Sequence, residues 1–357
     1  MNDLSHKPSV LVGMSGGVDS SVTVALLREQ GYQVQGAVIL FSPAHEKAVE
    51  EAKTAARQLD VPLTVLDARA DFEAHVAAPF CASYCAGRTP NPCLLCNPNV
   101  KFRSLVQAAD RLGCEKIATG HYARVEQDEK GVWRVFRPKS DARDQTYMLY
   151  GLGQEVLSRL LLPLGENQKP EIREMARQAQ LECADSPDSM EICFIPDGDH
   201  AAYIAARGLH APAGQFISPD GKALGPNLGI DHYTVGQRKG LGLALGRPAY
   251  VCGRDLVHNT VTVGPPQALA CRALTAKTVN WVALAGLAGP LRVQACTRYH
   301  QLPQAATVTP CGEGVRVTFD SPQRAVSPGQ TVVLYDGELV LAAGAIDQTF
   351  PEIETEE

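Results

Sequence analysis

Apolar and polar positions alternate along the first 120 residues in a repeating order of strand and helix. Short apolar runs predict four strands, at Ser9–Gly13, Gln33–Leu40, Leu63–Asp67 and Lys116–Thr119. Apolar residues at helical spacing predict three helices among them, at residues 20–30, 44–59 and 101–112. Strands and helices that alternate in this way are typical of a parallel sheet covered by helices. The pattern therefore predicts an α/β fold whose N-terminal part is a doubly wound parallel sheet.

The pattern changes further along the chain. Residues 125–136 read as a β-hairpin, and residues 170–180 read as a helix with a proline in its first turn. After about residue 206 helical spacing nearly vanishes, and short alternating runs predict a small antiparallel β-barrel, at residues 291–295, 315–319, 331–335 and 339–343. These changes predict three domains, at residues 1–205, 206–269 and 270–357.

Length, composition and charge limit the class of protein. The chain has 357 residues, 45% of them hydrophobic, which suits about two or three globular domains. No apolar run approaches the roughly 20 residues that span a bilayer and no secretion signal is visible, so we expect a cytoplasmic protein. The net charge of -6 argues against wholesale coating of nucleic acid but allows a local RNA-binding face. Eleven cysteines indicate thiol or metal chemistry and not a disulfide scaffold.

A loop of small residues follows the first strand and leads into an apolar helix: Ser15-Gly16-Gly17-Val18-Asp19-Ser20-Ser21. Adjacent glycines let backbone N–H groups approach an anion, the helix start adds the positive end of its dipole, and Ser15 and Ser20 add hydroxyl donors. The loop lacks the Gly-Lys-Ser/Thr ending of a Walker loop and the spacing of GxGxxG. It resembles the pyrophosphate loop of ATP pyrophosphatases, which implies ATP cleavage between the α and β phosphates. Ligands of open parallel sheets lie at the carboxyl ends of strands, so we expect Gly120 and His121 to share this site.

Four cysteines lie within sixteen residues, at Cys81, Cys85, Cys93 and Cys96, among several prolines. We expect this segment to be an irregular loop dense in thiols. One interpretation is a structural zinc site, because Cys-x2-Cys is a common half-site, while Cys81 and Cys85 also suit core positions of a helix.

Only the second pair of these cysteines indicates chemistry. Cys96 lies in a proline-stiffened loop, and three nearby cations could lower its pKa: Arg88, Lys101 and Arg103. Another cysteine, Cys193, has apolar neighbours and would by itself be interpreted as a core thiol.

A series of motifs in one order resembles the bacterial tRNA-specific 2-thiouridylase family over nearly the whole chain. They are the pyrophosphate loop, Gly87-Arg88-Thr89-Pro90-Asn91-Pro92 with Cys96-Asn97, Thr119-Gly120-His121-Tyr122-Ala123-Arg124, Asp144-Gln145, Ile192-Cys193-Phe194-Ile195, the segment 233–242, Arg298-Tyr299 and the segment 323–330. The resemblance implies an N-terminal domain like the adenine nucleotide α-hydrolases. It also implies an enzyme that uses ATP to replace the C2 oxygen of the wobble uridine by sulfur in tRNAs for Lys, Glu and Gln.

The resemblance also implies the role of each site residue. Cys193 carries sulfur as a persulfide received from a cysteine desulfurase system or relay, and Cys96 is the nucleophile that attacks it and forms a Cys96–Cys193 disulfide. ATP, with Mg²⁺, is expected to contact Gly13, Met14, Ser15, Gly16, Gly17, Val18, Asp19, Ser20, Ile39 and Gly120. The tRNA is expected to contact Asn91, Pro92, Cys93, His121, Arg143, Asp144, Gln145, Arg298, Tyr299 and Gln330. We expect a monomer that has no association with membranes.

One departure from the family leaves the sulfur chemistry open. Many members have aspartate where this chain has Cys93, so Cys93, Cys96 and Cys193 are also candidate ligands of an iron–sulfur cluster that binds sulfide. Two further hypotheses compete with the thiouridylase. A pyrophosphate-loop ligase acting on a small metabolite would explain the loop but not the cysteines, and a zinc-containing RNA-binding protein would explain the cysteines but not the loop.

Overall fold

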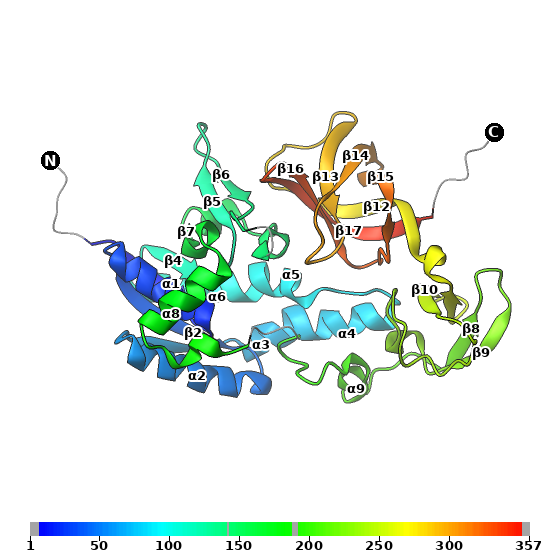
Figure 1. The fold of residues 1–357 in the computed structure, drawn as a ribbon, viewed down its shortest axis with the longest axis horizontal. Helices are drawn as coiled ribbons and strands as arrows, with labels where there is room; N and C mark the ends of the chain where they lie inside the picture. The colour runs from blue at the N-terminus through cyan, green and yellow to red at the C-terminus, as the bar shows by residue number, and fades with distance from the viewer. Residues whose placement is uncertain (1–6, 141–142, 188–191, 352–357) are drawn as a thin grey trace. The chain divides into compact units, whose positions relative to one another are not determined.

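The structure is a computed structural model that describes residues 7–140, 143–187 and 192–351. The chain forms two compact units (Figure 1). Unit 1 consists of Met1–Ala77, Pro92–Gly198 and Glu338–Val340, and unit 2 consists of Ala78–Asn91, Asp199–Gly337 and Leu341–Glu357. None of the helices within the described ranges combines the length and apolar character needed to cross a bilayer.

Unit 1 is built on a parallel five-stranded sheet. Its order is β3-β2-β1-β4-β7, with bounds Leu63–Asp67, Gln33–Leu40, Ser9–Gly13, Lys116–Thr119 and Leu160–Leu161. All four pairings are parallel. The four predicted strands and the α/β fold class are confirmed, while the two-residue strand β7 was not predicted.

Helices cover both faces of this sheet. The helices are α1 (Val18–Glu29), α2 (Glu46–Gln58), α3 (Arg69–Phe72), α5 (Pro92–Cys96), α6 (Phe102–Leu112), α7 (Gln154–Leu157) and α8 (Lys169–Gln178). Val10 and Val12 of β1 pack in one core with side chains of α1 and α2. Residues of β1 that point the other way face α6, since a Cβ added at Gly13 would lie 3.2 Å from Leu105. The sheet is therefore doubly wound, as predicted.

A hairpin and a late helix complete the described part of unit 1. The predicted hairpin is formed by β5 (Arg124–Gln127) and β6 (Trp133–Phe136), and Asp128 stabilises its turn by accepting hydrogen bonds from the N–H groups of Lys130 and Val132. Helix α8 begins at Lys169, one residue before the predicted start, and its capping box uses Gln168 and Glu171.

The cysteine-rich segment is helical, so the prediction of an irregular loop was wrong for most of it. Cys81 and Cys85 lie in α4 (Ala78–Cys85) of unit 2, whereas Cys93 and Cys96 lie in α5 of unit 1. A π-helical turn, η3 (Asn97–Lys101), joins α5 to α6. Pro92 is at the start of α5, where a missing N–H group breaks no intrahelical hydrogen bond, whereas Pro98 lies in the π-helical turn between α5 and α6.

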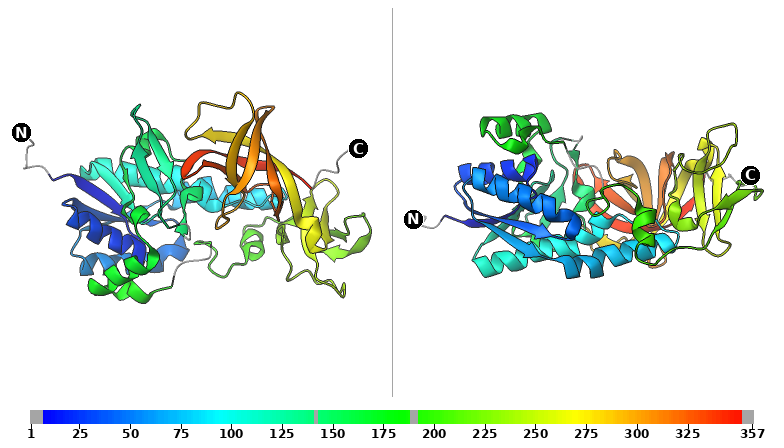
Figure 2. Two further views of the ribbon diagram at one scale, coloured as in Figure 1. Left: turned by 45° about the horizontal axis from the view of Figure 1, so that its top comes forward. Right: turned by 90° about the horizontal axis from the view of Figure 1, so that it is seen from below.

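Unit 2 contains α4, α9 (His200–Ala205), a small sheet and a barrel. The small sheet has the order β10-β11-β8-β9, with bounds Tyr250–Asp255, Thr260–Gly264, Gly214–Ile217 and Ala223–Asn227. The barrel order is β12-β15-β14-β13-β16-β17, with bounds Ala270–Trp281, Gly314–Arg324, Gln304–Cys311, Leu291–Cys296, Thr331–Asp336 and Leu339–Phe350. A β12–β17 pairing closes it, and its strands run in colour from yellow (β12) through orange to red (β17) in Figures 1 and 2. The predicted barrel is confirmed, although β12 and β14 were missed; the three domain boundaries stay a prediction.

Candidate nucleotide and thiol sites

The loop after β1 lies where the order of the sheet reverses. From β1 the chain builds β2 and β3 on one side, and β4 then pairs with the other edge of β1. Such a reversal opens a crevice at the carboxyl ends of the two central strands. A Cβ added at Gly120, directly after β4, would lie 2.8 Å from the carbonyl carbon of Asp19. The structure therefore brings Gly120 against the start of α1, as expected for a shared site.

The loop is held in shape by its own backbone and hydroxyl groups. Gly16 has a φ of +80°, and a Cβ there would lie 2.5 Å from Glu51 Cβ, so glycine is required. Ser20 Oγ accepts a hydrogen bond from Ser15 N and donates one to Gly17 O, each at 3.1 Å. Gly17 caps α1 without a side-chain hydrogen bond, which leaves the first N–H groups of the helix available to an anion.

A buried lysine, which the sequence analysis missed, completes this site. Lys169 at the start of α8 is only 7% exposed, and its Nζ lies 2.7 and 2.8 Å from the two carboxylate oxygens of Asp19. Tyr122 donates a hydrogen bond of 2.8 Å to the same carboxylate. Asp19, predicted to contact ATP, is thus fixed by two partners. A lysine before a proline at a helix start was the one available signal.

The remaining predicted ATP contacts lie on the elements that frame the crevice. Gly13 ends β1, and Met14 follows it with its N–H donating to Ala37 O. Val18 is the first residue of α1, and Ile39 is a buried residue near the carboxyl end of β2. All predicted ATP residues therefore belong to β1, β2, α1 or the loops after β1 and β4.

Three predicted thiols lie close together in unit 1. Each of Cys93, Cys96 and Cys193 is a free cysteine. The negative charge of a neighbouring cysteine raises the pKa of the Cys96 thiol and that of the Cys193 thiol. For Cys96 the neighbours are both Cys93 and Cys193. Positions 96 and 193, far apart in the chain, are thus neighbours in the fold.

The prediction that nearby cations lower the pKa of the reactive thiol was wrong in its net effect. Burial raises the pKa of Cys96 to about 12. The side chains of Cys93 and Cys193 are exposed, but desolvation by the protein atoms around them raises the pKa of Cys93 and raises that of Cys193 to about 11. Lys101 opposes the shift of the pKa at all three thiols but does not overcome it. Of the other predicted cations, Arg88 pairs with Asp347 in unit 2, at 2.9 Å.

The described residues do not fit a metal or a cluster. Among them, no group of three or more Cys, His, Asp or Glu side chains is arranged to hold a metal ion. Cys93, Cys96 and Cys193 are neighbours without forming such a group. Neither the iron–sulfur alternative nor the zinc alternative therefore has a preformed site in this part of the chain.

His121 follows Gly120 at the end of β4 and is neutral. Its Nδ1 lies 2.7 Å from Thr119 Oγ1, and its ring lies 5.8 Å from that of Phe102. Burial, assisted by the charge of Lys101, holds the pKa of His121 well below its ordinary value. Lys101 thus acts electrostatically on His121 as well as on the thiols.

Three predicted tRNA contacts of unit 1 lie in a hydrogen-bonded turn. Asp144 accepts from Arg137 Nε at 2.6 Å and from Thr146 N at 2.8 Å. Gln145 Oε1 accepts from Tyr122 N at 2.8 Å. Arg143 donates its N–H to Ser140 O. The side chains of Asp144 and Gln145 are engaged within the protein, so their first role is to fix this turn.

Two of the predicted tRNA contacts of unit 2 lie at one cavity. Arg298 and Gln330 both line a cavity of about 420 Å³, together with Thr89, Ser327 and Arg324. The ring of Tyr299 lies 3.8 Å from that of His300. Asn91 is the last residue of unit 2 before α5, which begins with Pro92 and Cys93 of unit 1.

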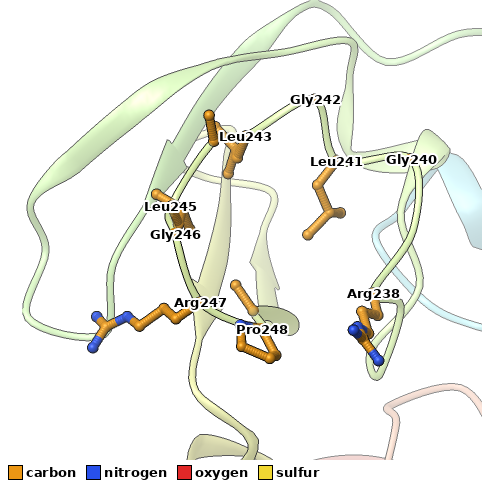
Figure 3. A pocket seen from close by; sticks show the side chains of 11 residues that line it. Arg238, Gly240, Leu241, Gly242, Leu243, Leu245, Gly246, Arg247 and Pro248 are labelled. Carbon is orange, nitrogen blue, oxygen red and sulfur yellow. The ribbon is translucent and has the colours of Figure 1, made fainter.

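The glycine-rich segment singled out in the sequence is an open loop of unit 2. Residues 238–249 curve around a cavity of about 620 Å³ (Figure 3). Arg238 and Arg247 lie toward the two ends of this loop, with Leu241, Leu243 and Leu245 between them in the chain. The loop combines basic and apolar side chains but holds no group that suits covalent chemistry.

Family models and curated relatives both match the chain over most of its length. Family models described as the HUP domain and the PRC-barrel domain of tRNA methyl transferase match residues 8–197 and 202–265, and one described as the aminomethyltransferase beta-barrel domain matches residues 271–346. The tRNA-specific 2-thiouridylase MnmA of Heliobacterium modesticaldum is 46% identical over 97% of this chain and 95% of its own length. The protein of the same name from Clostridium perfringens is 44% identical, over 96% and 99%.

A solved structure was also found. The match to a 4-thiouridine synthetase in complex with RNA and ATP covers 50% of this chain and 43% of the synthetase chain, with 17% sequence identity. The TM-score of 0.34 is too low to support an argument about function.

Proposed function

The chain belongs to the tRNA-specific 2-thiouridylase family, and we propose that the two neighbouring sites of unit 1 divide this reaction between activation and sulfur transfer. The protein is an ATP-using sulfurtransferase that introduces 2-thiouridine into tRNA. Beyond this, we propose the wobble uridine of tRNAs for Lys, Glu and Gln as the target. A metabolite ligase or a purely structural RNA-binding protein would leave the grouped thiols beside the nucleotide loop without a task.

The nucleotide loop supports the activating step. An unactivated uracil carbonyl is a poor electrophile, because its oxygen would have to leave as oxide. Attack of the C2 oxygen on the α-phosphate of ATP converts that oxygen into the leaving group AMP and releases pyrophosphate. The open N–H groups at the start of α1 and the glycine backbone at Gly16 and Gly17 are suited to hold the pyrophosphate.

Mg²⁺ enters this proposal only as the counterion that ATP carries and that neutralises phosphate charge. The carboxylate of the loop itself, Asp19, is bound to Lys169 and Tyr122. We therefore assign no dedicated protein ligand set to the ion. Lys169 fixes Asp19 and, with it, the first turn of α1.

The thiol group supports the sulfur step. A cysteine desulfurase system or its relay protein supplies a persulfide on Cys193. The thiolate of Cys96 attacks the Cys193 sulfur, the persulfide S–S bond breaks, and its terminal sulfur leaves as hydrosulfide. Hydrosulfide attacks C2 and AMP departs, while the two protein thiols have become a disulfide. An external dithiol then reduces this disulfide, so two electrons enter for each sulfur delivered.

The raised thiol pKa values set a requirement on this step. At neutral pH Cys96 is protonated in the free protein, because its pKa is about 12. The charge of Lys101 acts on His121 and on the thiols, so we propose that Lys101 favours loss of the Cys96 proton once substrates fill the site. An iron–sulfur route is not proposed, because the described residues form no metal-holding group.

For the tRNA we propose the contacts that the family pattern assigns. Asn91, Pro92 and Cys93 read the target base, which has to leave its stack before it can react. His121 lies next to the adenylated base, and the turn 143–145 together with Arg298, Tyr299 and Gln330 holds the RNA. We further propose that the enzyme acts as a monomer in the cytoplasm.

The observation that carries the proposal is that Cys96 and Cys193 are neighbours in unit 1 and that the charge of Lys101 acts on both thiols and on His121. The test is mass spectrometry of tRNA nucleosides after reaction with the Cys193→Ala variant, with Cys311→Ala on barrel strand β14 as the matched control. We expect Cys193→Ala to abolish 2-thiouridine while tRNA-dependent ATP–pyrophosphate exchange persists, and Cys311→Ala to behave as wild type. Unchanged thiolation by Cys193→Ala would rule out the carrier role. Exchange stimulated by a metabolite instead of tRNA would favour the ligase.

A further inference from the structure

We propose that Thr89 is a positioning residue, through which the barrel and the small sheet of unit 2 hold the backbone that leads to the base-reading residues Asn91, Pro92 and Cys93. This inference rests on the function proposed above for those three residues. It goes beyond that function because neither Thr89 nor its partner Arg254 has been given a role. It also changes the role expected of Gln330.

Every hydrogen-bonding group of Thr89 is engaged within unit 2. Its N–H donates to Pro328 O at 2.9 Å, and its carbonyl oxygen accepts from Gln330 Nε2 at 3.0 Å. Its hydroxyl oxygen accepts from Ser327 Oγ at 3.0 Å and from Arg254 Nη2 at 2.6 Å. Thr89 is only 7% exposed. Four hydrogen bonds from two parts of the unit therefore converge on one residue of the connecting segment between α4 and α5.

Arg254 is an unusual partner, because it is a half-buried cation whose Nε is completely buried. Its Nη1 donates to Tyr233 O at 2.7 Å, and its Nε is buried without a hydrogen-bond partner among the described residues. Burial lowers the pKa of Arg254 to about 10, so the guanidinium is still charged at neutral pH. No ion pair of Arg254 is found in the described part of the chain. A buried charge without a carboxylate is costly, and here its two Nη groups hold Thr89 and the end of η8 (Ile230–His232).

The barrel turn that meets Thr89 fits closely. Gly329 has a φ of +92°, and a Cβ there would lie 2.8 Å from both Arg88 Cβ and Thr89 N. Arg88, the preceding residue, pairs with Asp347 of β17 at 2.9 Å. Two successive residues of the connecting segment are thus fixed to the barrel. This geometry leaves little freedom to the backbone two residues before Asn91.

The same contacts form a wall of the 420 Å³ cavity where RNA contacts are expected. Thr89, Ser327 and Gln330 line this cavity together with Arg298. The family pattern assigns Gln330 to tRNA, yet its side-chain amide donates to Thr89 O. We therefore expect Gln330 to act mainly by holding Thr89. RNA that fills the cavity beside Arg298 would then bear directly on the segment that leads to the target-base residues.

The test compares Thr89→Val, which keeps the shape but removes the hydroxyl acceptor, with Thr89→Ser, which keeps the acceptor. Single-turnover thiolation at saturating tRNA and ATP should fall about tenfold or more in Thr89→Val, because misplaced reacting groups slow the chemical step. The Kd for tRNA should stay within about twofold. Thr89→Ser should recover most of the wild-type rate. Gln330→Met removes the donor to Thr89 O and should likewise lower the rate.

A second measurement keeps the inference separate from the proposed function. Hydrogen exchange of the free protein should show faster exchange in peptides spanning residues 86–93 of Thr89→Val than in Thr89→Ser. Faster exchange in Thr89→Val supports the positioning role even if the wild type does not thiolate tRNA. Failure of the wild type to thiolate tRNA would contradict only the proposed function. Where Thr89→Val does not fold, Ser327→Ala removes a single one of the four hydrogen bonds and takes its place. Wild-type exchange and a wild-type rate in these variants, or a raised tRNA Kd with an unchanged rate, would overturn the inference.

Discussion

The nucleotide loop and the thiol group of unit 1 differ in how far each is prepared for chemistry before a substrate binds. The loop is ready, since its glycine conformation, internal hydroxyl bonds and open helix start are all present in the free protein. The thiols are gathered but largely protonated, because burial of Cys96 keeps its pKa at about 12 and desolvation by neighbouring protein atoms keeps that of Cys193 at about 11.

This difference suits a reaction with an ordered course. A thiolate that formed before the uridine was activated would release hydrosulfide without use. A thiol that loses its proton only when substrates have filled the site would couple sulfur release to adenylation. The protein therefore combines a preformed anion site with a nucleophile that awaits its substrate.

The largest effect is expected from a substitution that disturbs the nucleotide loop. Gly120→Ala should lower kcat/KM for ATP by about a hundredfold, because the new Cβ would lie 2.8 Å from the backbone of Asp19 and displace the start of α1. Gly153→Ala is the matched control, since a Cβ there meets nothing within 4 Å. ATP–pyrophosphate exchange measures both. Equal loss in the two variants would mean that the crevice after β4 is not the nucleotide site.

The buried ion pair beside the loop should matter for stability. Lys169→Met leaves the carboxylate of Asp19 without its cation, and we expect the free energy of unfolding to fall by about 2 kcal/mol in urea titrations. Lys53→Met removes an exposed pair with Glu50 and should cost less than about 0.5 kcal/mol. Similar losses for the two lysines would show that Lys169 does not fix the loop.

The reactivity of Cys96 toward an alkylating reagent tests whether the thiols are inactive in the free protein. Between pH 7 and 9 iodoacetamide should modify Cys96 at least about tenfold more slowly than the exposed Cys311, because the raised pKa leaves little thiolate. Lys101→Met should slow Cys96 further, since the lysine charge lowers the pKa of that thiol. Peptide mass spectrometry gives the individual rates. Faster modification of Cys96 than of Cys311 in the free enzyme would contradict a nucleophile that awaits its substrate.

The smallest effect concerns His121. Its pKa is depressed in the folded state, so the unfolded chain binds more protons below the ordinary histidine pKa near 6.5. The contribution of His121 to the free energy of unfolding should therefore be complete above pH 7 and should decline as the pH falls toward 5. His121→Asn should weaken this decline by roughly 1 kcal/mol in unfolding measured at both pH values. An unchanged pH profile would mean that the pKa of His121 is not depressed in the folded state.

The comparison also separates what the sequence can predict from what it cannot. Strand, loop and helix around Gly16 and Gly17 depend on neighbours in the chain, and the bounds of the four strands were correctly predicted. The state of Cys96 depends on burial by distant segments, and nearby cations in the sequence indicated the wrong direction of its pKa shift. The ion pair of Lys169 with Asp19 joins residues 150 positions apart. Thr89 meets partners 165 to 241 positions away.

The cysteine-rich segment shows a second limit. Its prolines indicated irregular structure, yet Pro92 is at a helix start, where proline is favourable, and Pro98 lies in the π-helical turn η3. Strands β12 and β14 were not predicted from the sequence. Burial along each strand is largely alternating, but exposed and half-buried polar residues interrupt the apolar pattern on which the prediction depended.

The central claim is that Cys96 and Cys193 exchange sulfur as a pair. The direct measurement is one turnover of enzyme persulfidated on Cys193, with saturating ATP and tRNA and without reductant, followed by acid quench and peptide mass spectrometry. The account predicts one Cys96–Cys193 disulfide for each 2-thiouridine formed. Thiolated tRNA accompanied by free thiols at both positions would contradict it.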